Sequence, residues 1–361
     1  MFWTQQDQQP SRQSLPRQIA LRRGTMDDEY ATFEVMRRTM GHEMAWSHHA
    51  AARRHLQNTE CASFWLAVEK QRFSGSKVVG YARSVVREGV WSLTEFFVLP
   101  GHHRQGIGGA LLARCQEDGK NFGADTRIIL ASQHSAADSL YVRKLDCFPR
   151  LPMMMLVGSL AKLRSPERTE SPIIETMLAF ADPEMHRVST SVQGEIIRAE
   201  PMVQSPEVSE AIDALDRRIV GYARPLEHAF WAHEMGGVAG PSRIFRRAQR
   251  SADGAEELGE IVGYAYMGPH SSGPALADCP ADLPHMIAHV ARLSGISSNA
   301  DSDLDLVQYP EQYLALAGTN EVILKWLLEC GWHIVFHYLF MTSRPIGSLD
   351  RYVGYNPLYF L

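Results

Sequence analysis

The sequence predicts an α+β protein in three layers, built from two similar halves in tandem. Three observations lead to this prediction. Strand-like and helix-like segments alternate along the chain. A strand, a glycine-rich turn and the start of a helix follow one another from Trp91 to Arg114. The second half repeats the order of these segments at low fidelity, as tandem domains do.

Composition sets the limits for this prediction. The chain has 361 residues, enough for two domains of ordinary size, and 45% of them are hydrophobic, which supports packed cores. A net charge of −5 argues against a broad basic surface for nucleic acid. No apolar run approaches the roughly 20 residues that span a membrane, and the first residues lack the apolar core of a signal peptide. Five scattered cysteines without a CxxC pair predict reduced thiols and a cytoplasmic location.

The first half reads as an ordered series of strands and helices. A strand at 18–22 precedes a helix that starts near Thr25 and runs to Met40, and a second helix covers about 49–56. Three strands then follow with short turns between them, at 62–68, 77–86 and 92–99. After the glycine-rich turn and its helix, the remaining segments are a strand at 127–132, a helix at 135–144 and a strand at 151–160.

The glycine-rich turn is the most informative stretch. The strand from Ser92 to Leu99 stops at Pro100, and the segment Gly106-Ile107-Gly108-Gly109 opens the next helix. A helix that starts in this way offers several backbone N–H groups with no partner, and its dipole adds roughly half a positive charge at that end. Glycine also lets a ligand approach the backbone closely. Together these features predict a pyrophosphate-binding loop.

Two other phosphate loops fit this stretch less well. A Walker loop needs GKS or GKT after the glycines, and residues 106–112 contain no such run. A dinucleotide fingerprint needs a third glycine and an acidic residue at the end of the next strand. Leu111 stands at the third glycine position, and the strand at 127–132 ends without a carboxylate.

The sequence Val98-x-Pro100, followed by RQGIGGALL at 104–112, resembles the acyl-CoA signature of the GCN5-related N-acetyltransferase (GNAT) superfamily. The family pattern has Arg or Gln three residues after the proline, where this chain has His103, with Arg104 next. Because such a loop acts mainly through backbone amides, we expect phosphate binding to survive, with Arg104 supplying charge from a shifted position. The resemblance implies a mixed, mostly antiparallel central sheet flanked by helices in each half.

The last helix of the first half also resembles the family. GNAT domains commonly carry N-x-x-A-x-x-L-Y there, and this chain matches it with His134, Ala137, Leu140 and Tyr141. The Gly-Phe step that usually follows is displaced and altered to Cys147-Phe148.

The second half resembles the same pattern more weakly. Val-Gly-Tyr-Ala occurs at 79–82 and at 262–265, although the same letters also stand at 220–223. The run from Asn320 to Trp332 fits the last-helix pattern, but Leu327 replaces the tyrosine. The run 273–282, where a pyrophosphate loop is expected, contains prolines and carboxylates, so we expect this half to be degenerate.

The predicted organisation is a flexible arm at 1–17, a GNAT acetyltransferase domain at 18–163, a linker at 164–192 and a degenerate GNAT-like domain at 193–361. A short helix is expected within the linker, at 174–180. The sequence leaves open whether the two halves pack within one chain or mediate a homodimer.

The resemblance also implies site residues. The residues expected to pair with the pantetheine arm and the acyl carbonyl are Phe97, Val98 and Leu99. The amides expected to bind the pyrophosphate are those of Arg104, Gln105, Gly106, Ile107, Gly108, Gly109 and Ala110.

Two side chains are candidates for proton transfer. Tyr141 is the candidate general acid for the leaving thiolate, with a packed aromatic as the alternative. Glu95, on the strand among aromatic residues, is a candidate base, with a structural hydrogen bond as an equally weighted alternative. Four histidines between 42 and 55 fit a solvated helix face better than a metal site, so no metal is expected.

The predicted function is therefore an acetyl-CoA-dependent N-acetyltransferase that transfers the acyl group to a primary amine by direct attack in a ternary complex. The partners are acyl-CoA and an amine acceptor, with no nucleic acid and no membrane. The alternative is a non-catalytic acyl-CoA-binding or interaction module.

Overall fold

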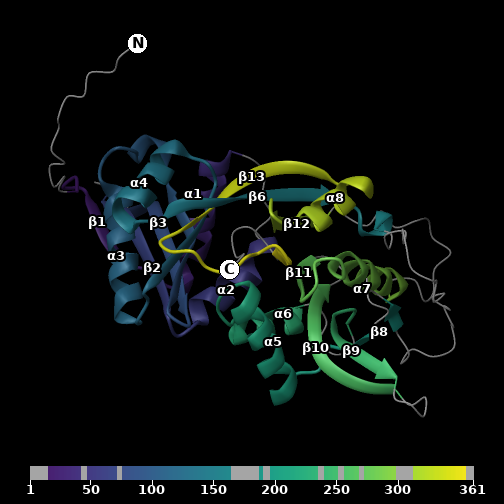
Figure 1. The fold of residues 1–361 in the computed structure, drawn as a ribbon. Coiled ribbons are helices and arrows are strands. Elements are labelled where there is room, and N and C mark those ends of the chain that lie inside the picture. Colours follow the sequence, from purple (N-terminus) through teal and green to yellow (C-terminus); the bar gives the residue numbers. More distant parts are fainter. Residues whose placement is uncertain are drawn as a thin grey trace, which may run out of the picture. The chain divides into compact units, whose positions relative to one another are not determined.

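The structure is a computed structural model that describes residues 15–41, 47–70, 75–163, 187–189, 196–234, 240–250, 256–267, 272–297 and 312–354. The chain divides into two compact units (Figure 1). Unit 1 comprises Met1–Ile128 and Ser139–Asp146, and unit 2 comprises Ile129–Asp138 and Cys147–Leu361.

Unit 1 contains an antiparallel sheet in which the strands follow one another in chain order. Its strands are β1 (Ile19–Arg23), β2 (Ala62–Lys70), β3 (Ser76–Arg87) and β4 (Val90–Val98). Its helices are η1 (Met26–Asp28), α1 (Glu29–Met40), α2 (Ser47–Asn58), η2 (Pro100–His102) and α3 (Ile107–Asn121). The division between the units passes through β5 (Thr126–Ala131) and α4 (Ser135–Leu145).

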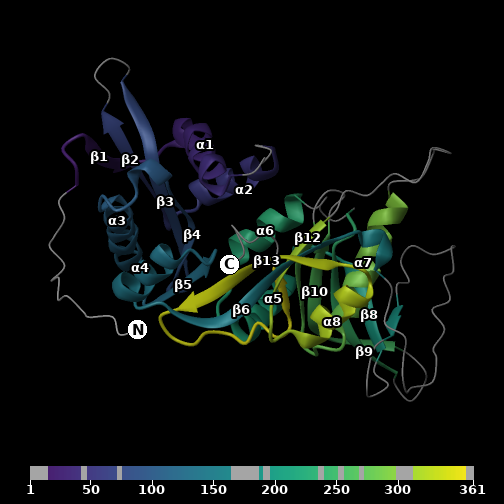
Figure 2. The same cartoon turned by 90° about the horizontal axis from the view of Figure 1, so that it is seen from above.

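Helices cover both faces of this sheet. In Figure 2, α1 and α2 lie on one side of β2–β4 and α3 lies on the other. The α3 face is fixed by Trp91, whose Nε1 donates to the carbonyl oxygen of Cys115 at 3.1 Å. A Cβ added to Gly119 would lie 2.3 Å from the same indole, so the helix can approach the strand this closely only with glycine there.

Unit 2 contains a longer sheet with the strand order β13-β6-β12-β14-β11-β10-β9-β8-β7. Its strands are β6 (Phe148–Gly158), β7 (Arg187–Ser189), β8 (Ile196–Pro201), β9 (Arg243–Arg250), β10 (Glu256–Met267), β11 (Ser272–Ala277), β12 (Gln312–Ala317), β13 (His333–Thr342) and β14 (Tyr352–Gly354). Its helices are η3 (Leu160–Lys162), α5 (Pro206–Ile219), α6 (Pro225–Glu234), α7 (Leu283–Ser297) and α8 (Glu321–Glu329). The described neighbours in this sheet run antiparallel.

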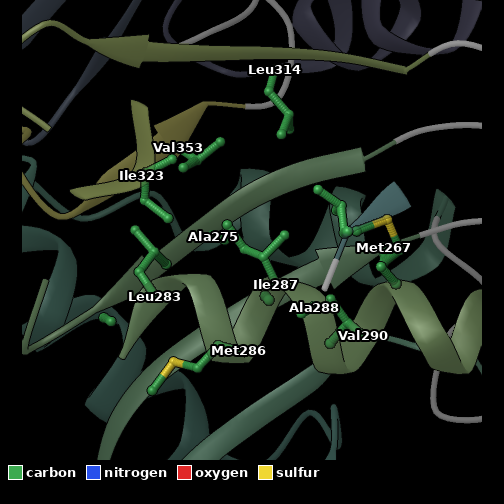
Figure 3. Packing of buried hydrophobic residues seen from close by; sticks show 14 of the residues in the cluster. Met267, Ala275, Leu283, Met286, Ile287, Ala288, Val290, Leu314, Ile323 and Val353 are labelled. Atoms are coloured by element: carbon green, nitrogen blue, oxygen red, sulfur yellow. The ribbon is translucent and has the colours of Figure 1, made fainter. Parts of the chain in front are cut away.

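The core of unit 2 lies between the sheet and α7. Figure 3 shows Met286, Ile287 and Val290 of α7 packed toward strand residues that include Met267. Successive residues of a strand face opposite sides of the sheet, so Tyr264 and Tyr266 of β10 share one side. Their hydroxyls contact Asp216 of α5 and His228 of α6, which places them on the side of these two helices.

The order of elements in the second half repeats that of the first. From β1 to β6 the chain runs strand, two helices, three strands, helix, strand, helix, strand, and the same order runs from β8 to β13. β7 and β14 stand outside this repeat. The sequence repeat at 79–82 and 262–265 lies in the second of three successive strands in each half, β3 and β10, whereas the third copy at 220–223 lies in the turn after α5.

The glycine of the sequence repeat has similar surroundings in β3 and β10. A Cβ on Gly80 would lie 3.0 Å from the carbonyl oxygen of Phe97, and a Cβ on Gly263 would lie 2.6 Å from that of Leu276. Each glycine therefore serves the same close approach of the following strand.

The structure extends or alters several sequence predictions. β6 was expected to close the first half, but it lies in unit 2, antiparallel to both β12 and β13. The unit boundaries therefore cross the predicted domain ranges, which stay a prediction. Gly273 and Pro274 belong to β11 rather than to a loop. The predicted helix at 174–180 and most of the arm at 1–17 lie outside the described residues.

Candidate functional site

The turn between β4 and α3 is built on two left-handed residues. Arg104 has φ +61 and Gly106 has φ +81, and Gly106 is the N-cap of α3. For residues other than glycine, this left-handed backbone conformation costs roughly 1–2 kcal/mol. The glycine predicted from the sequence is therefore needed for the conformation of the turn itself.

The turn leaves a run of donors without acceptors. The first helical bond of α3 joins the amide of Ala110 to the carbonyl oxygen of Gly106 at 3.0 Å. Among the described residues, the structure gives no acceptor to the backbone N–H groups of 104–109. Consecutive unpaired N–H groups at a helix N-terminus, with the dipole behind them, favour a bound anion.

The last two glycines of the turn have different surroundings. A Cβ on Gly108 would lie 3.0 Å from the ring of Phe96 and 3.7 Å from Leu140, so this glycine allows close packing. A Cβ on Gly109 would meet no atom within 4 Å. Gly109 is therefore not required by the packing of the protein, and the space beside it is open to a ligand.

Tyr141 lies next to the same turn through a shared neighbour. Its ring centroid is 6.0 Å from that of Phe96, whose ring also touches the position of Gly108. Tyr141 is 6% exposed. Phe96 therefore brings the candidate acid and the glycine turn together, and it is a site residue that the sequence analysis did not single out.

The end of β4 presents a backbone edge beside the turn. The amide of Leu99 donates to the carbonyl oxygen of Val79 on β3 at 2.9 Å. Because neighbouring residues of a strand direct their backbone groups to opposite edges, the N–H and C=O of Val98 point away from β3. The ring Nε2 of His103 lies 2.8 Å from the carbonyl oxygen of Val98. This histidine therefore occupies the C=O of Val98, a residue expected to pair with pantetheine, and leaves its N–H open.

Two other side chains of the turn contact residues of unit 1. The Nε2 atom of His102 lies 3.4 Å from Oε1 of Glu69, and Nε2 of Gln105 donates to the carbonyl oxygen of Gly101 at 3.2 Å. The side chain of Arg104 is exposed, which leaves it available to a phosphate.

Glu95 lies on the opposite face of β4, toward α1 and α2. Its Oε1 accepts from Arg53 at 2.7 Å, and its Oε2 lies 2.9 Å from Nε of Arg83. Arg53 also donates to the hydroxyl of Tyr81 at 2.7 Å, and both the Arg53 and Glu95 side chains are fully buried. Arg83 pairs in turn with Glu29, which closes a buried network of alternating charges.

This network bears on the predicted base. Both carboxylate oxygens of Glu95 lie within 3 Å of guanidinium nitrogen atoms of unit 1, so the side chain is directed into the buried network. The contacts favour the structural alternative for Glu95, and its role as a base stays a prediction. The signal for its partners was present only as two isolated arginines, Arg53 and Arg83, far from it in sequence.

The match to a known family coincides with this region. The family model described as "Acetyltransferase (GNAT) family" matches residues 28–146. Residues 28–146 are a GNAT domain. No curated protein matches the chain. The GNAT domain begins at η1 and ends at the close of α4, so it contains the glycine turn, Phe96 and Tyr141.

Solved structures with the GNAT fold cover nearly the whole chain. A proposed acetyltransferase of Pyrococcus horikoshii has 14% identity and a TM-score of 0.61, with 96% of this chain and 97% of that chain covered. A GNAT protein of Sphaerobacter thermophilus has 14% identity and a TM-score of 0.52, covering 94% and 100%. A tandem GNAT protein from the clavulanic acid pathway has 15% identity and a TM-score of 0.50, covering 91% and 99%. These likenesses confirm the predicted fold class.

Other sequence candidates contribute less to the site. The side chains of His48 and His49, and all of His42, lie outside the described residues. Within the described part of the chain, no three His, Cys, Asp or Glu side chains gather as a metal site would require. No helix among these residues has the length and apolar character needed to cross a membrane.

Proposed function

We propose that this chain is a cytoplasmic, acetyl-CoA-dependent N-acetyltransferase that transfers the acyl group to a primary amine by direct attack in a ternary complex. The observation that carries the proposal is the run of backbone N–H groups at 104–109 that have no acceptor among the described residues. Such a run matches the charge and spacing of a pyrophosphate.

The acyl donor would bind along the turn and the strand end. The amides of 104–109 would receive the pyrophosphate, with Arg104 adding charge from the solvent side. Pantetheine would extend along the edge of β4, where the N–H of Val98 points away from β3. Open space beside Gly109 lets the donor reach the backbone.

The chain's own residues would then move one proton and hold the reacting groups together. The neutral amine attacks the thioester carbonyl, and the C–S bond breaks to release a thiolate. A tyrosine hydroxyl carries its proton at neutral pH, so Tyr141 can protonate that thiolate. Since Glu95 is bound by Arg53 and Arg83, we assign removal of the ammonium proton to water rather than to this carboxylate.

A non-catalytic acyl-CoA-binding module remains the second candidate. Two observations favour it, the burial of Glu95 among arginines and the contact of His103 with the strand edge. Such a module binds acyl-CoA at the same turn but releases no thiol when amines are added.

Calorimetric titration with acetyl-CoA tests donor binding, with Gly106→Ala beside Gly123→Ala as a matched control. Both glycines have φ near +80, at +81 and +80, so both substitutions place a Cβ at a left-handed position, but only Gly106 lies at the turn. We expect binding to weaken at least about tenfold in Gly106→Ala only. Absence of binding to the folded wild-type protein would overturn the proposal.

Thiol release with a panel of primary amines separates the two candidates. For an enzyme, Tyr141→Phe should lower kcat by about 10²-fold or more while the affinity for acetyl-CoA stays unchanged. Release of thiol that does not rise above the amine-free rate with any amine would favour the binding module.

A further inference from the structure

The short strand β14 lies between β11 and β12 in unit 2, antiparallel to both. Val353 is opposite Ala275 on β11 and Leu316 on β12. In the repeat described above, β11 and β12 occupy the places in chain order that β4 and β5 hold in the first half. In the second half, β14 therefore separates β11 from β12, the two strands that correspond to β4 and β5.

Register identifies which groups β14 takes. The amide of Asp278 donates to the carbonyl oxygen of Val262 at 2.7 Å, just as the amide of Leu99 donates to that of Val79. Asp278 is thus the counterpart of Leu99, and Ala277 is the counterpart of Val98. The amide of Ala277 donates to the carbonyl oxygen of Arg351 at 3.3 Å. This is the edge group that the proposed function assigns to pantetheine in the first half.

The edge of β14 that faces β12 also accepts a hydrogen bond from a side chain. Asn320, the N-cap of α8, donates through Nδ2 to the carbonyl oxygen of Tyr352 at 3.3 Å. Asn320 stands at the asparagine position of the last-helix pattern, where the first half has His134. This polar group is therefore used by the protein's own backbone.

Side chains fix β14 in both directions. The hydroxyl of Tyr352 accepts from Nη1 of the buried Arg224 at 2.6 Å, on the face of α5 and α6. Val353 points the other way, into the α7 core drawn in Figure 3. Both side chains are fully buried. β14 is therefore an integral part of the core of unit 2 rather than a strand laid on its surface.

The turn equivalent in unit 2 has the charge that suits this occupant. Nη1 of Arg351 donates to the carbonyl oxygen of Asp278 at 2.6 Å and lies 3.6 Å from its carboxylate. Four residues, 279–282, connect this position to α7, whereas seven residues, 100–106, connect Leu99 to α3. A shorter turn with a carboxylate attracts a guanidinium and repels a phosphate.

We propose that unit 2 contains a peptide-binding slot between β11 and β12 that is occupied by the chain's own Arg351–Gly354 in the place of an acyl donor. The comparison with pantetheine rests on the proposed function of the first half. In this proposal the second half is not an empty remnant, since its cleft has been rebuilt to hold an extended strand with a basic residue at its start. The protein then binds one acyl-CoA, in the first half.

Hydrogen–deuterium exchange on the full chain tests the slot directly. Val353→Pro removes a backbone donor from β14 and disrupts its pairing, and Val203→Pro, at an exposed position outside the strands, is the matched control. We expect amides of β11, β12 and β14 to exchange about tenfold faster or more in Val353→Pro, while β9 and β10 stay protected.

A peptide of residues 348–354 added in trans should restore this protection to Val353→Pro, and the same peptide with Tyr352→Ala should not. Unchanged exchange in the folded Val353→Pro chain, or no effect of the peptide, would overturn the proposal. If Val353→Pro fails to fold, Arg351→Glu provides the second test, because it opposes Asp278 and should speed exchange in 278–282 and β14.

Acetyl-CoA stoichiometry gives a separate test. One site per chain, weakened in Gly106→Ala, is expected, whereas two sites per wild-type chain would overturn the slot. If no site is found, the proposed acetyltransferase function fails, while the exchange data still decide whether β14 fills a peptide slot.

Discussion

The imidazole of His103 and the backbone of Val98 are joined by a contact of 2.8 Å between Nε2 and the carbonyl oxygen. A carbonyl accepts, so Nε2 carries the proton in this contact. The residue that departs from the family pattern thus reaches back to the strand edge where an acyl donor is expected. Its contact competes with the donor for the same acceptor.

Replacing this histidine should therefore strengthen donor binding. The net free energy of one hydrogen bond is about 0.5–1.5 kcal/mol, so His103→Ala should tighten acetyl-CoA binding by about two- to tenfold in a calorimetric titration. His102→Ala is the control, because His102 contacts Glu69 instead of the strand edge. Weaker binding in His103→Ala would show that the histidine assists the donor.

Gly109 should matter to the ligand and not to the fold. A Cβ there meets no atom of the protein within 4 Å, so Gly109→Val should leave the free energy of unfolding within about 1 kcal/mol of wild type. The added side chain should fill the space of the donor and weaken acetyl-CoA binding at least about tenfold. Gly101→Val, at another open position, should bind normally. Equal binding by both variants would place the donor elsewhere.

Glu95 should prove to be structural. Glu95→Gln leaves two buried guanidinium groups short of a counter-charge, and breaking a buried pair costs about 3–5 kcal/mol in the free energy of unfolding. Denaturant titration measures this loss, and Glu34→Gln, in a partly exposed pair with Arg37, should cost less than about 1 kcal/mol. A variant that is fully stable but has lost thiol release would instead identify Glu95 as the base.

The salt bridge between Arg22 and Asp28 predicts how stability depends on pH. Hydrogen bonds from the Arg22 guanidinium, at 2.6 and 2.7 Å, hold the pKa of Asp28 below its ordinary value. A carboxyl pKa that is lower in the folded state adds stability above the unfolded value of about 4, and this stability is lost as the pH falls toward the folded value.

The Tm of Asp28→Asn should therefore lie below that of wild type at pH 6–8, and the gap should narrow below about pH 4. Asp27→Asn, at the exposed neighbouring position, should show no such gap. A gap that stays constant down to about pH 2 would mean that the difference does not come from this carboxylate's charge.

Much of the architecture could be read from local patterns. Helix caps, alternating apolar residues and glycine breaks predicted the position of nearly every element of the first half, because these signals act over a few residues. The glycine turn was predicted from local sequence, with its glycines expected to let a ligand approach the backbone. The structure adds that Gly106 is a left-handed N-cap. In the second half, β11, α7 and β12 went unpredicted, because their apolar residues resemble buried segments of either type.

Long-range partners could not be predicted in this way. The sequence by itself determined the order of elements in the first half and the internal repeat, and it predicts that the glycine turn binds phosphate. Only the tertiary structure decided that Glu95 lies between Arg53 and Arg83, that β6 pairs with β12 and β13, and that β14 enters the sheet of unit 2. A three-residue strand such as β14 has too few residues for a periodic pattern, and the choice of a strand's neighbour depends on which edges the rest of the fold leaves open.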